Sequence, residues 1–213
     1  MPEFRRVGFD PNFIGYQEGF DLQKQIHADV VARKLPDTVL LLEHRSVYTA
    51  GKRTEMEELP RDGSEYFETN RGGKITWHGP GQLVGYPIMH LPQPIDVVGY
   101  VRFLEQVLID CIAEFGITGT RVDGRTGVWV ETEDGYEKVA AIGIRVAEKV
   151  TMHGFALNCN NSLEPYENII ACGISDAKTT TLSQLAGRNI TPLDAVTLIE
   201  KQMGEIPNVR IKA

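Results

Sequence analysis

The sequence predicts an α+β fold in which a mixed, largely antiparallel β-sheet is flanked by helices. Three consecutive runs with strand-like composition, at 127–131, 138–146 and 151–159, are joined by short polar turns. Short connections of this kind favour antiparallel neighbours. Helical patterns lie before and after these runs instead of alternating with them, which argues against a doubly wound parallel sheet.

Helical periodicity predicts two long helices, at 16–34 and 97–115, the second with Asp96 as its cap. Cys111 falls on the apolar face of the second helix, so we expect it to be buried. Residues 38–42 form a continuous apolar run, typical of a strand that is covered on both faces. Shorter helical candidates occupy 164–170, 181–186 and 193–203.

One domain is expected for residues 1–213, because this length suits a single folded unit. The formal charge of −7 argues against an extended nucleic-acid-binding surface, since phosphates are bound by clustered Lys and Arg. No apolar run is long enough for a membrane span, and the first residues lack the apolar core of a signal peptide. We therefore expect a cytoplasmic protein that contacts neither nucleic acid nor membrane.

Two polar segments stand out between the predicted strands. Residues 49–69 have the composition of a long solvated loop. Residues 71–86 contain five glycines, which permit a positive φ and the close approach of another backbone or of a ligand. This stretch is either a hairpin with a His-Gly-Pro-Gly turn or the wall of a ligand site. It lacks the Gly-Lys-Ser/Thr ending of a phosphate-binding loop.

The three cysteines, Cys111, Cys159 and Cys172, have neither metal-ligand spacing nor an even count, so no metal site and no disulfide framework is predicted. Cys172 differs from the others because it lies outside the periodic apolar faces and precedes a glycine. It is a candidate nucleophile, although a cysteine is more often a small buried apolar residue.

A nucleophilic thiol requires a cationic neighbour that favours the thiolate. The candidates are Lys138 and four histidines, His44, His78, His90 and His153. Lys138 begins a predicted strand whose next residues are small or apolar, so its ammonium is expected at the mouth of an apolar cleft. The alternative for Lys138 is a lysine whose side chain extends into water.

Four segments together resemble a known enzyme family. They are RGGKITWHGPGQ at 71–82, KVAAIG at 138–143, HGFALN at 153–158 and ACGI at 171–174. In this order they are similar to the octanoyl-[acyl-carrier-protein]:protein N-octanoyltransferases, the lipoyl (octanoyl) transferases of lipoate biosynthesis. The resemblance spans residues 40–185 without departure at the motif positions. It implies a fold similar to the catalytic domains of biotin and lipoate protein ligases.

The resemblance also implies roles for individual residues. Cys172 matches the acyl-thioester nucleophile, and Lys138 matches the lysine that lowers the pKa of this thiol and transfers protons. His78 and His153 are expected at the polar rim, with His153 as an orienting group. The matching substrate-binding positions are Arg71, Gly72, Gly73, Lys74, Ile75, Thr76, Trp77, His78, Ala141, Ile142, Gly143, Gly154, Phe155 and Ala156.

The implied reaction moves an octanoyl group from octanoyl-acyl carrier protein to a lysine of a lipoyl domain, without cofactor or metal. The acceptors would be the lipoyl domains of 2-oxoacid dehydrogenase E2 subunits and the glycine cleavage H protein. Ile75, Ile142 and Phe155 are expected as walls of the acyl pocket, with Gly72, Gly73, Gly143 and Gly154 leaving a narrow space. Docking is expected at a basic patch formed by Arg121, Arg125 and Arg145.

Three other functions remain open at this point. An ATP-dependent lipoate or biotin protein ligase would use the glycine-rich stretch to hold an acyl-adenylate, without a nucleophilic cysteine. A non-catalytic module that binds acyl carrier protein or lipoyl domains would use the same pocket without turnover. A Cys/His hydrolase is the weakest alternative, because no Asn or Asp can be assigned to orient the histidine.

Overall fold

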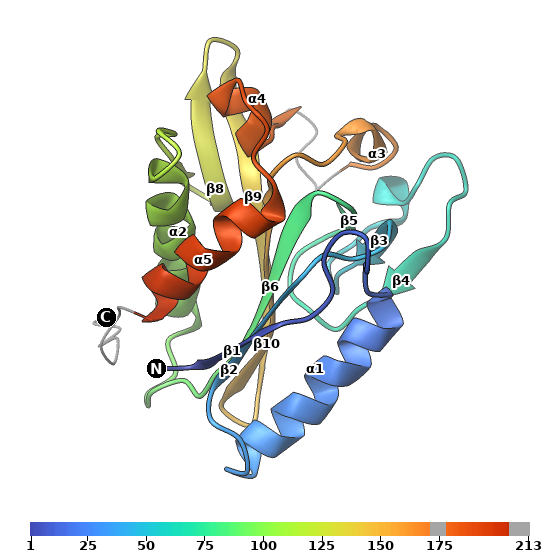
Figure 1. Cartoon of the computed structure of the whole chain (residues 1–213). Coiled ribbons are helices and arrows are strands. Elements are labelled where there is room, and N and C mark those ends of the chain that lie inside the picture. The colour runs from blue at the N-terminus through green and yellow to red at the C-terminus, as the bar shows by residue number, and fades with distance from the viewer. Residues whose placement is uncertain (171–177, 205–213) are drawn as a thin grey trace.

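An eight-stranded mixed sheet forms the centre of the computed structural model, which describes residues 1–170 and 178–204 (Figure 1). Its main order is β1-β2-β6-β10-β9-β8-β7, and β11 pairs with β9. Within this sheet, only the pairs β1–β2 and β9–β11 are parallel among the described strands, so the predicted fold class is confirmed. The strands are β1 (Glu3–Arg6), β2 (Thr38–Leu42), β6 (Gln82–Ile88), β7 (Thr120–Val122), β8 (Arg125–Thr132), β9 (Gly135–Ala147), β10 (Val150–Asn158) and β11 (Lys178–Thr179).

The predicted meander of three strands is confirmed as β8, β9 and β10, each antiparallel to the next. Glu148 and Lys149 form the turn between β9 and β10, with φ angles of 50° and 67°. Positive φ at both turn residues matches the twist of the flanking strands and keeps the connection to two residues. β8 pairs with β9 only as far as Ala140, so the second half of β9 has no strand on that side among the described residues.

Helices cover both faces of the sheet (Figure 1). α1 (Tyr16–Val31) packs on one face, where it covers Leu40 and Leu42, while α2 (Val97–Ala113) and α5 (Pro192–Gly204) cover Val39 and Leu41 on the other. β2 is therefore buried on both faces, as its continuous apolar run predicts. The shorter helices are α3 (Glu164–Glu167) and α4 (Leu182–Ala186).

Two sequence expectations about α2 are confirmed. Asp96 caps the helix, because its carboxylate accepts a hydrogen bond from the backbone N–H of Gly99 at 2.7 Å. Cys111 is fully buried in the core between α2 and α5. Within residues 1–170 and 178–204, no helix has both the length and the apolar content that a membrane crossing requires.

The prediction that residues 49–69 form a long loop holds for 51–65, apart from one 3₁₀ turn, but is wrong at both ends. β3 (Val47–Ala50), β4 (Tyr66–Glu68) and β5 (Thr76–His78) form a second, three-stranded sheet with the order β4-β3-β5, and a 3₁₀ helix, η1 (Met56–Glu58), lies between β3 and β4. The polar composition concealed these short strands, because their pairing partners are distant in sequence.

The hairpin interpretation of the glycine-rich stretch is also wrong. β5 pairs with β3 in the small sheet, whereas β6 pairs with β2 and β10 in the large one. The chain crosses between the sheets at Gly81, whose N–H donates to the buried carboxylate of Glu43 at 2.7 Å. Gly81 has φ of +84°, and a β-carbon there would lie 2.7 Å from the backbone nitrogen of Asn161. Only glycine fits this crossing without displacement.

Candidate functional site

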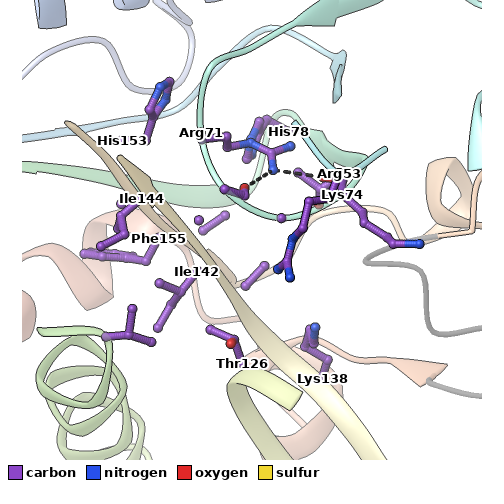
Figure 2. Close-up of a pocket in the computed structure, with 18 of the residues that line it drawn as sticks. Arg53, Arg71, Lys74, His78, Thr126, Lys138, Ile142, Ile144, His153 and Phe155 are labelled. Carbon is purple, nitrogen blue, oxygen red and sulfur yellow. Dashed lines mark hydrogen bonds between the residues drawn. The ribbon is translucent and has the colours of Figure 1, made fainter. Parts of the chain in front are cut away.

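A cavity of about 470 Å³ lies between the glycine-rich loop, β9, β10 and the N-terminal turn of α2 (Figure 2). The loop at 71–74 borders the half of β9 that β8 leaves uncovered, and the N–H of Gly72 donates to the carbonyl of Ile144 at 2.9 Å. The architecture therefore brings together residues that are up to 140 positions apart in the sequence, from Tyr16 to Ala156.

Most residues that the sequence predicts for the site line this cavity. Ile75 and Trp77 are the exceptions, because side chains alternate along an extended segment and those of Thr76 and His78 take the cavity side. Trp77 instead donates from its indole to the hydroxyl of Ser46 at 2.9 Å. The predicted residues that line the cavity are Arg71, Gly72, Gly73, Lys74, Thr76, His78, Lys138, Ala141, Ile142, Gly143, His153, Gly154, Phe155 and Ala156.

Sequence reasoning missed several lining residues. Ile144 could have been found, since it lies two positions after Ile142 on the same strand. No motif marks Tyr16 at the start of α1, or Val97 and Val101 on α2. The missed set is Tyr16, Arg53, Tyr86, Val97, Val101, Gly124, Thr126 and Ile144, while Arg125 was predicted only for docking.

Cys172 lies outside the described residues. Of the described cysteines, Cys111 and Cys159 are both fully buried, and burial raises the pKa of the Cys111 thiol to about 12 and that of Cys159 further. Neither thiol can therefore supply a thiolate at neutral pH. After the segment at 171–177, the chain resumes at β11, where Thr179 pairs with Lys138 and the N–H of Thr180 donates to the Lys138 carbonyl at 3.0 Å.

Lys138 is 8% exposed, although it is a lysine. Its ammonium lies 4.6 Å from the ring centroid of Trp129, a cation–π distance. Gly127 lies beside it, and a β-carbon there would overlap the carbonyl oxygen of Ala140 while making only ordinary contact with Lys138 Cε at 3.6 Å. Among residues 1–170 and 178–204, no carboxylate forms an ion pair with Lys138. A buried ammonium that faces an aromatic ring and has no carboxylate partner among the described residues is suited to bind an anion or to transfer a proton.

Arg71 organises the glycine-rich loop. Its guanidinium donates to the carbonyl and hydroxyl of Thr49 at 2.6 and 2.9 Å, and to the carbonyl of Lys74 at 2.9 Å. These bonds hold the loop against β3. Gly51 leaves space for the contact, since a β-carbon there would overlap the carbonyl of Gly73.

The glycines on β9 and β10 do not leave space in the way the sequence suggested. A β-carbon on Gly154 would overlap the carbonyl oxygen of Gly85 on β6, and one on Gly143 would lie 3.1 Å from the carbonyl oxygen of Gly72. These glycines therefore permit close approach between backbones. The shape of the cavity therefore depends on how closely these backbones pack, and not only on the lack of side chains at the glycines.

Three of the candidate histidines are buried and neutral. Burial lowers the pKa of His44 to about 4 and that of His78 and His153 to about 3. His78 is held by Gln82 and His153 by Asn70, in both cases at 2.7 Å. The expectation that His78 and His153 lie at a rim is wrong, and neither can serve as the cation beside a thiolate. His90 pairs with Asp37 and does not line the cavity.

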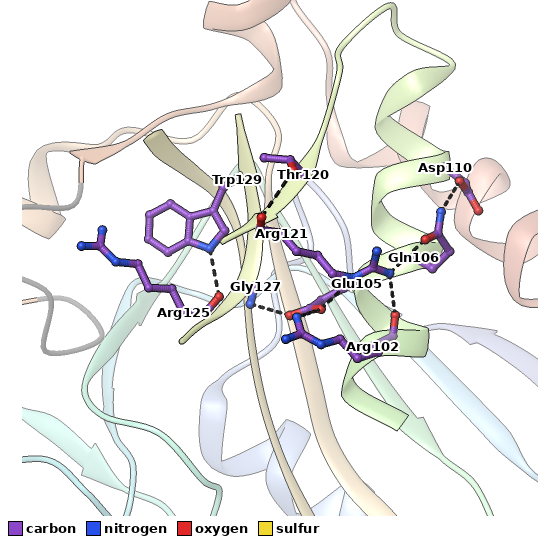
Figure 3. Close-up of polar contacts among 9 residues, drawn as sticks. All are labelled: Arg102, Glu105, Gln106, Asp110, Thr120, Arg121, Arg125, Gly127 and Trp129. Carbon is purple, nitrogen blue, oxygen red and sulfur yellow. Dashed lines mark hydrogen bonds and ion pairs between the residues drawn. The ribbon is translucent and has the colours of Figure 1, made fainter. Parts of the chain in front are cut away.

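A buried carboxylate on α2 holds the start of β8 (Figure 3), next to Thr126, which lines the cavity. Glu105 on α2 accepts hydrogen bonds from Arg102 at 2.7 Å, from Arg121 at 3.0 Å and from the backbone N–H of Gly127 at 3.1 Å. The ion pairs compensate the burial of the carboxylate. Arg121 is thus committed to Glu105 and is not the free docking residue that the sequence suggested.

No set of three or more His, Cys, Asp or Glu side chains in the described part of the chain is arranged to hold a metal ion. The polar groups of the cavity are instead cations and neutral donors, around an apolar section formed by Ile142, Ile144 and Phe155 (Figure 2). Such a lining suits a ligand with an apolar chain and one polar or reactive end.

Several solved structures with a similar fold are ligases. A bi-partite lipoate protein ligase from Thermoplasma acidophilum superposes with a TM-score of 0.68 at 12% identity, covering 96% of this chain and 84% of the ligase chain. A lipoate-protein ligase A bound with ATP gives 0.66 at 8% identity, covering 96% and 84%. A biotin protein ligase from Aquifex aeolicus gives 0.57 at 12% identity, covering 96% and 70%. These likenesses confirm the expected fold.

The sequence relatives define the family more narrowly than the solved structures do. The family model described as "Lipoyl protein ligase A/B catalytic domain" matches residues 15–204. A protein from Clavibacter sepedonicus named octanoyltransferase is 57% identical over 202 residues, which cover 92% of this chain and 87% of that protein. Another octanoyltransferase, from Leifsonia xyli subsp. xyli, is 54% identical over 93% of this chain and 90% of its own length. The chain therefore belongs to the octanoyltransferases of the lipoyl protein ligase A/B catalytic-domain family.

Proposed function

We propose that this protein transfers an octanoyl group from octanoyl-acyl carrier protein to a lysine of a lipoyl domain, through an acyl thioester on Cys172. The observation that carries the proposal is the placement of Lys138. Its buried ammonium lies at the cavity, and β11 beside it directly follows the segment that contains Cys172. The name octanoyltransferase, given to relatives at 52–57% identity, supports the same activity.

The first chemical step exchanges one thioester for another and needs no ATP. The Cys172 thiolate attacks the carbonyl carbon of the octanoyl thioester, a new C–S bond forms, and the bond to the carrier thiol breaks. The departing thiolate takes up a proton. The Lys138 ammonium stabilises the attacking thiolate and donates this proton to the departing thiolate.

The second step forms the amide. The ε-amine of the acceptor lysine attacks the octanoyl-enzyme, the C–N bond forms, and Cys172 leaves as its thiolate. The amine must lose one proton during this attack, and Lys138, which gave its proton to the carrier thiol, accepts it. Lys138 therefore returns to the ammonium form as the thiolate is restored, and the protons balance over one turnover.

The apolar section of the cavity matches the acyl chain. Burying the methylenes of an octanoyl chain at ~0.8 kcal/mol each contributes about 5 kcal/mol. Ile142, Ile144 and Phe155 on the sheet and Val97 and Val101 on α2 provide the apolar walls. The volume of about 470 Å³ lies in the range of small-molecule sites.

The acceptors in this proposal are lipoyl domains of 2-oxoacid dehydrogenase E2 subunits and the glycine cleavage H protein. The similar fold of the archaeal ligase, studied together with its E2 lipoyl domain, is consistent with that class of acceptor. Arg125 lines the cavity and remains, with Arg145 on β9, a candidate for docking the carrier protein.

Mass spectrometry of the intact protein tests the proposal. Incubation with octanoyl-acyl carrier protein in the absence of ATP is expected to add one octanoyl group, which transfers to an added lipoyl domain. Cys172→Ser is expected to reduce thioester formation by about 10³-fold or more. Cys111→Ser and Cys159→Ser serve as matched controls that retain the adduct.

Three outcomes would contradict this function. An octanoyl group on Cys111 or Cys159 would refute the role of Cys172. Modification of the lipoyl domain only in the presence of ATP and free octanoic acid would identify a ligase. Binding of the carrier protein without any acyl transfer would indicate a non-catalytic binding module.

A further inference from the structure

A short segment at 51–58, here called the strap, lies along the glycine-rich loop. It follows β3 and includes η1. The N–H of Lys52 donates to the carbonyl of Arg71, and the N–H of Arg53 donates to the carbonyl of Gly73, both at 3.1 Å. The strap thus adds two backbone hydrogen bonds to the outer edge of the loop that borders the cavity.

Lys74 fastens the strap at its other end. Its ammonium contacts the carboxylate of Glu58 at 2.5 Å and that of Glu55 at 3.1 Å. Glu58 is 4% exposed, so its charge depends on this ammonium for compensation. Glu55 and Glu58 also form a reciprocal capping box around η1, in which the N–H of Glu55 donates to Glu58 at 3.0 Å.

The side chains of Lys74 and Arg53 point in different directions. Figure 2 shows the Lys74 ammonium directed away from Ile142 and Phe155, whereas the Arg53 guanidinium extends toward them into the cavity. Arg53 is the strap residue that lines the cavity. Within the described residues, its guanidinium forms no ion pair, in contrast to the ammonium of Lys74.

We infer that Lys74 is a positioning residue, which holds the strap against the glycine-rich loop so that Arg53 contacts the acyl donor at the cavity. Lys74 itself does not touch the substrate. This inference rests on the proposed acyl transfer and differs from the family assignment, which places Lys74 among the substrate-binding residues. Two carboxylates occupy the Lys74 ammonium, so the substrate-facing cation on this side is Arg53.

Lys74→Met tests the inference with two independent measurements. Amide hydrogen exchange at Lys52 and Arg53 is expected to become about tenfold faster, because the buried carboxylate of Glu58 is left without its counter-charge and the strap opens to expose it to water. The KM for octanoyl-acyl carrier protein is expected to rise about tenfold with kcat within about twofold, since binding is lost and the chemical groups are unchanged. Lys24→Met removes an exposed ion-paired lysine on α1 and is the matched control, with neither change expected.

The double variant Lys74→Met/Glu58→Gln distinguishes positioning from direct contact. Removing the buried charge of Glu58 relieves the uncompensated carboxylate, so slow exchange and a KM within about twofold of the unsubstituted protein are expected to return. Glu58→Gln alone leaves the ion pair between Lys74 and Glu55 in place, and it is expected to increase amide exchange less than Lys74→Met does. It provides a test of the same contact should the Lys74→Met protein fail to fold.

The inference is wrong if the strap exchanges at its normal rate in Lys74→Met. It is also wrong if the double variant recovers slow exchange but keeps the raised KM, because Lys74 would then contact the substrate. If the unsubstituted protein fails to transfer octanoyl groups, the proposed function fails, and the exchange measurements alone decide whether Lys74 fastens the strap.

Discussion

Lys74 and Lys138 border the same cavity, but their surroundings are opposite. Lys74 is held by two carboxylates, and its hydrogen bond to Glu58, with that to Glu55, raises its pKa. Lys138 is more deeply buried and faces the ring of Trp129, without a carboxylate partner among residues 1–170 and 178–204. Two lysines of one cavity can thus differ in role, because a compensated ammonium holds structure together while an uncompensated one can respond to a reacting group.

Glu105 is a second buried charged group beside Gly127, and unlike Lys138 it is fully paired. This carboxylate is close, since it accepts a hydrogen bond from Gly127, and Gly127 lies against the side chain of Lys138. Arg102 and Arg121 bind the other oxygen of Glu105 (Figure 3). The two arginines therefore compensate the buried charge of Glu105.

Replacing each lysine with arginine should give the largest contrast. Arginine preserves charge but does not titrate in the functional range, so Lys138→Arg is expected to lower octanoyl transfer by at least about 100-fold. Lys74→Arg keeps a cation beside Glu55 and Glu58 and is expected to retain transfer within about threefold. Initial rates of lipoyl-domain modification, measured for both variants at one protein concentration, provide the comparison.

Either of two results would contradict the assignment of different roles to Lys74 and Lys138. Full transfer by Lys138→Arg would exclude proton transfer by Lys138. A loss in Lys74→Arg as large as that in Lys138→Arg would place both lysines in the reaction. A normal circular-dichroism spectrum and melting temperature for each variant are the necessary controls for folding.

The sequence predicted the large sheet well because its strands are apolar, long and adjacent in the chain. The meander at β8 to β10 and the doubly covered β2 follow from local patterns alone. The small sheet could not be predicted, since β3, β4 and β5 have three or four residues each and find partners across intervening segments. Short strands are specified by tertiary pairing and not by their own composition.

The site was predicted unevenly for a similar reason. Motif resemblance found Lys138 and most of the glycine-rich lining, which the structure brings to one cavity. It could not predict that the side chains of Ile75 and Trp77 point away from the cavity, because the face that each side chain takes depends on the residue at which β5 begins. It also could not identify the ion pairs of Lys74 or the burial of His78 and His153, since these depend on segments far away in sequence.

Glu105→Ala is expected to destabilise the wall of the cavity that α2 and β8 form beside Lys138. The substitution leaves Arg102 and Arg121 without their buried partner and the N–H of Gly127 without its acceptor. We expect the free energy of unfolding to fall by about 3 kcal/mol, as is typical when one partner of a buried ion pair is removed. Urea denaturation measures this change.

Asp110→Ala is the matched control for that substitution, because Asp110 lies on the same helix and accepts an exposed hydrogen bond from Gln106. Its expected effect is within about 0.5 kcal/mol. Equal destabilisation by the two substitutions would show that Glu105 contributes no more to stability than a surface carboxylate.

The contrast between the lysines also requires that the cavity histidines carry no charge. His153 has a folded pKa of about 3, lowered mainly by burial, whereas an unfolded histidine titrates near about 6.5. Between these values the unfolded chain binds the extra proton, so stability rises with pH through this window and is lost as pH falls from about 6.5 toward 3. His153→Gln is therefore expected to lessen the rise of the free energy of unfolding between pH 5 and 6 by up to about 1.4 kcal/mol per pH unit.

Urea denaturation at both pH values measures this slope for His153→Gln and for the unsubstituted protein. Between pH 8 and 9 the two proteins should have the same slope. An unchanged slope between pH 5 and 6 would mean that His153 is already protonated in the folded protein, and a third cation would then share the cavity with Lys138.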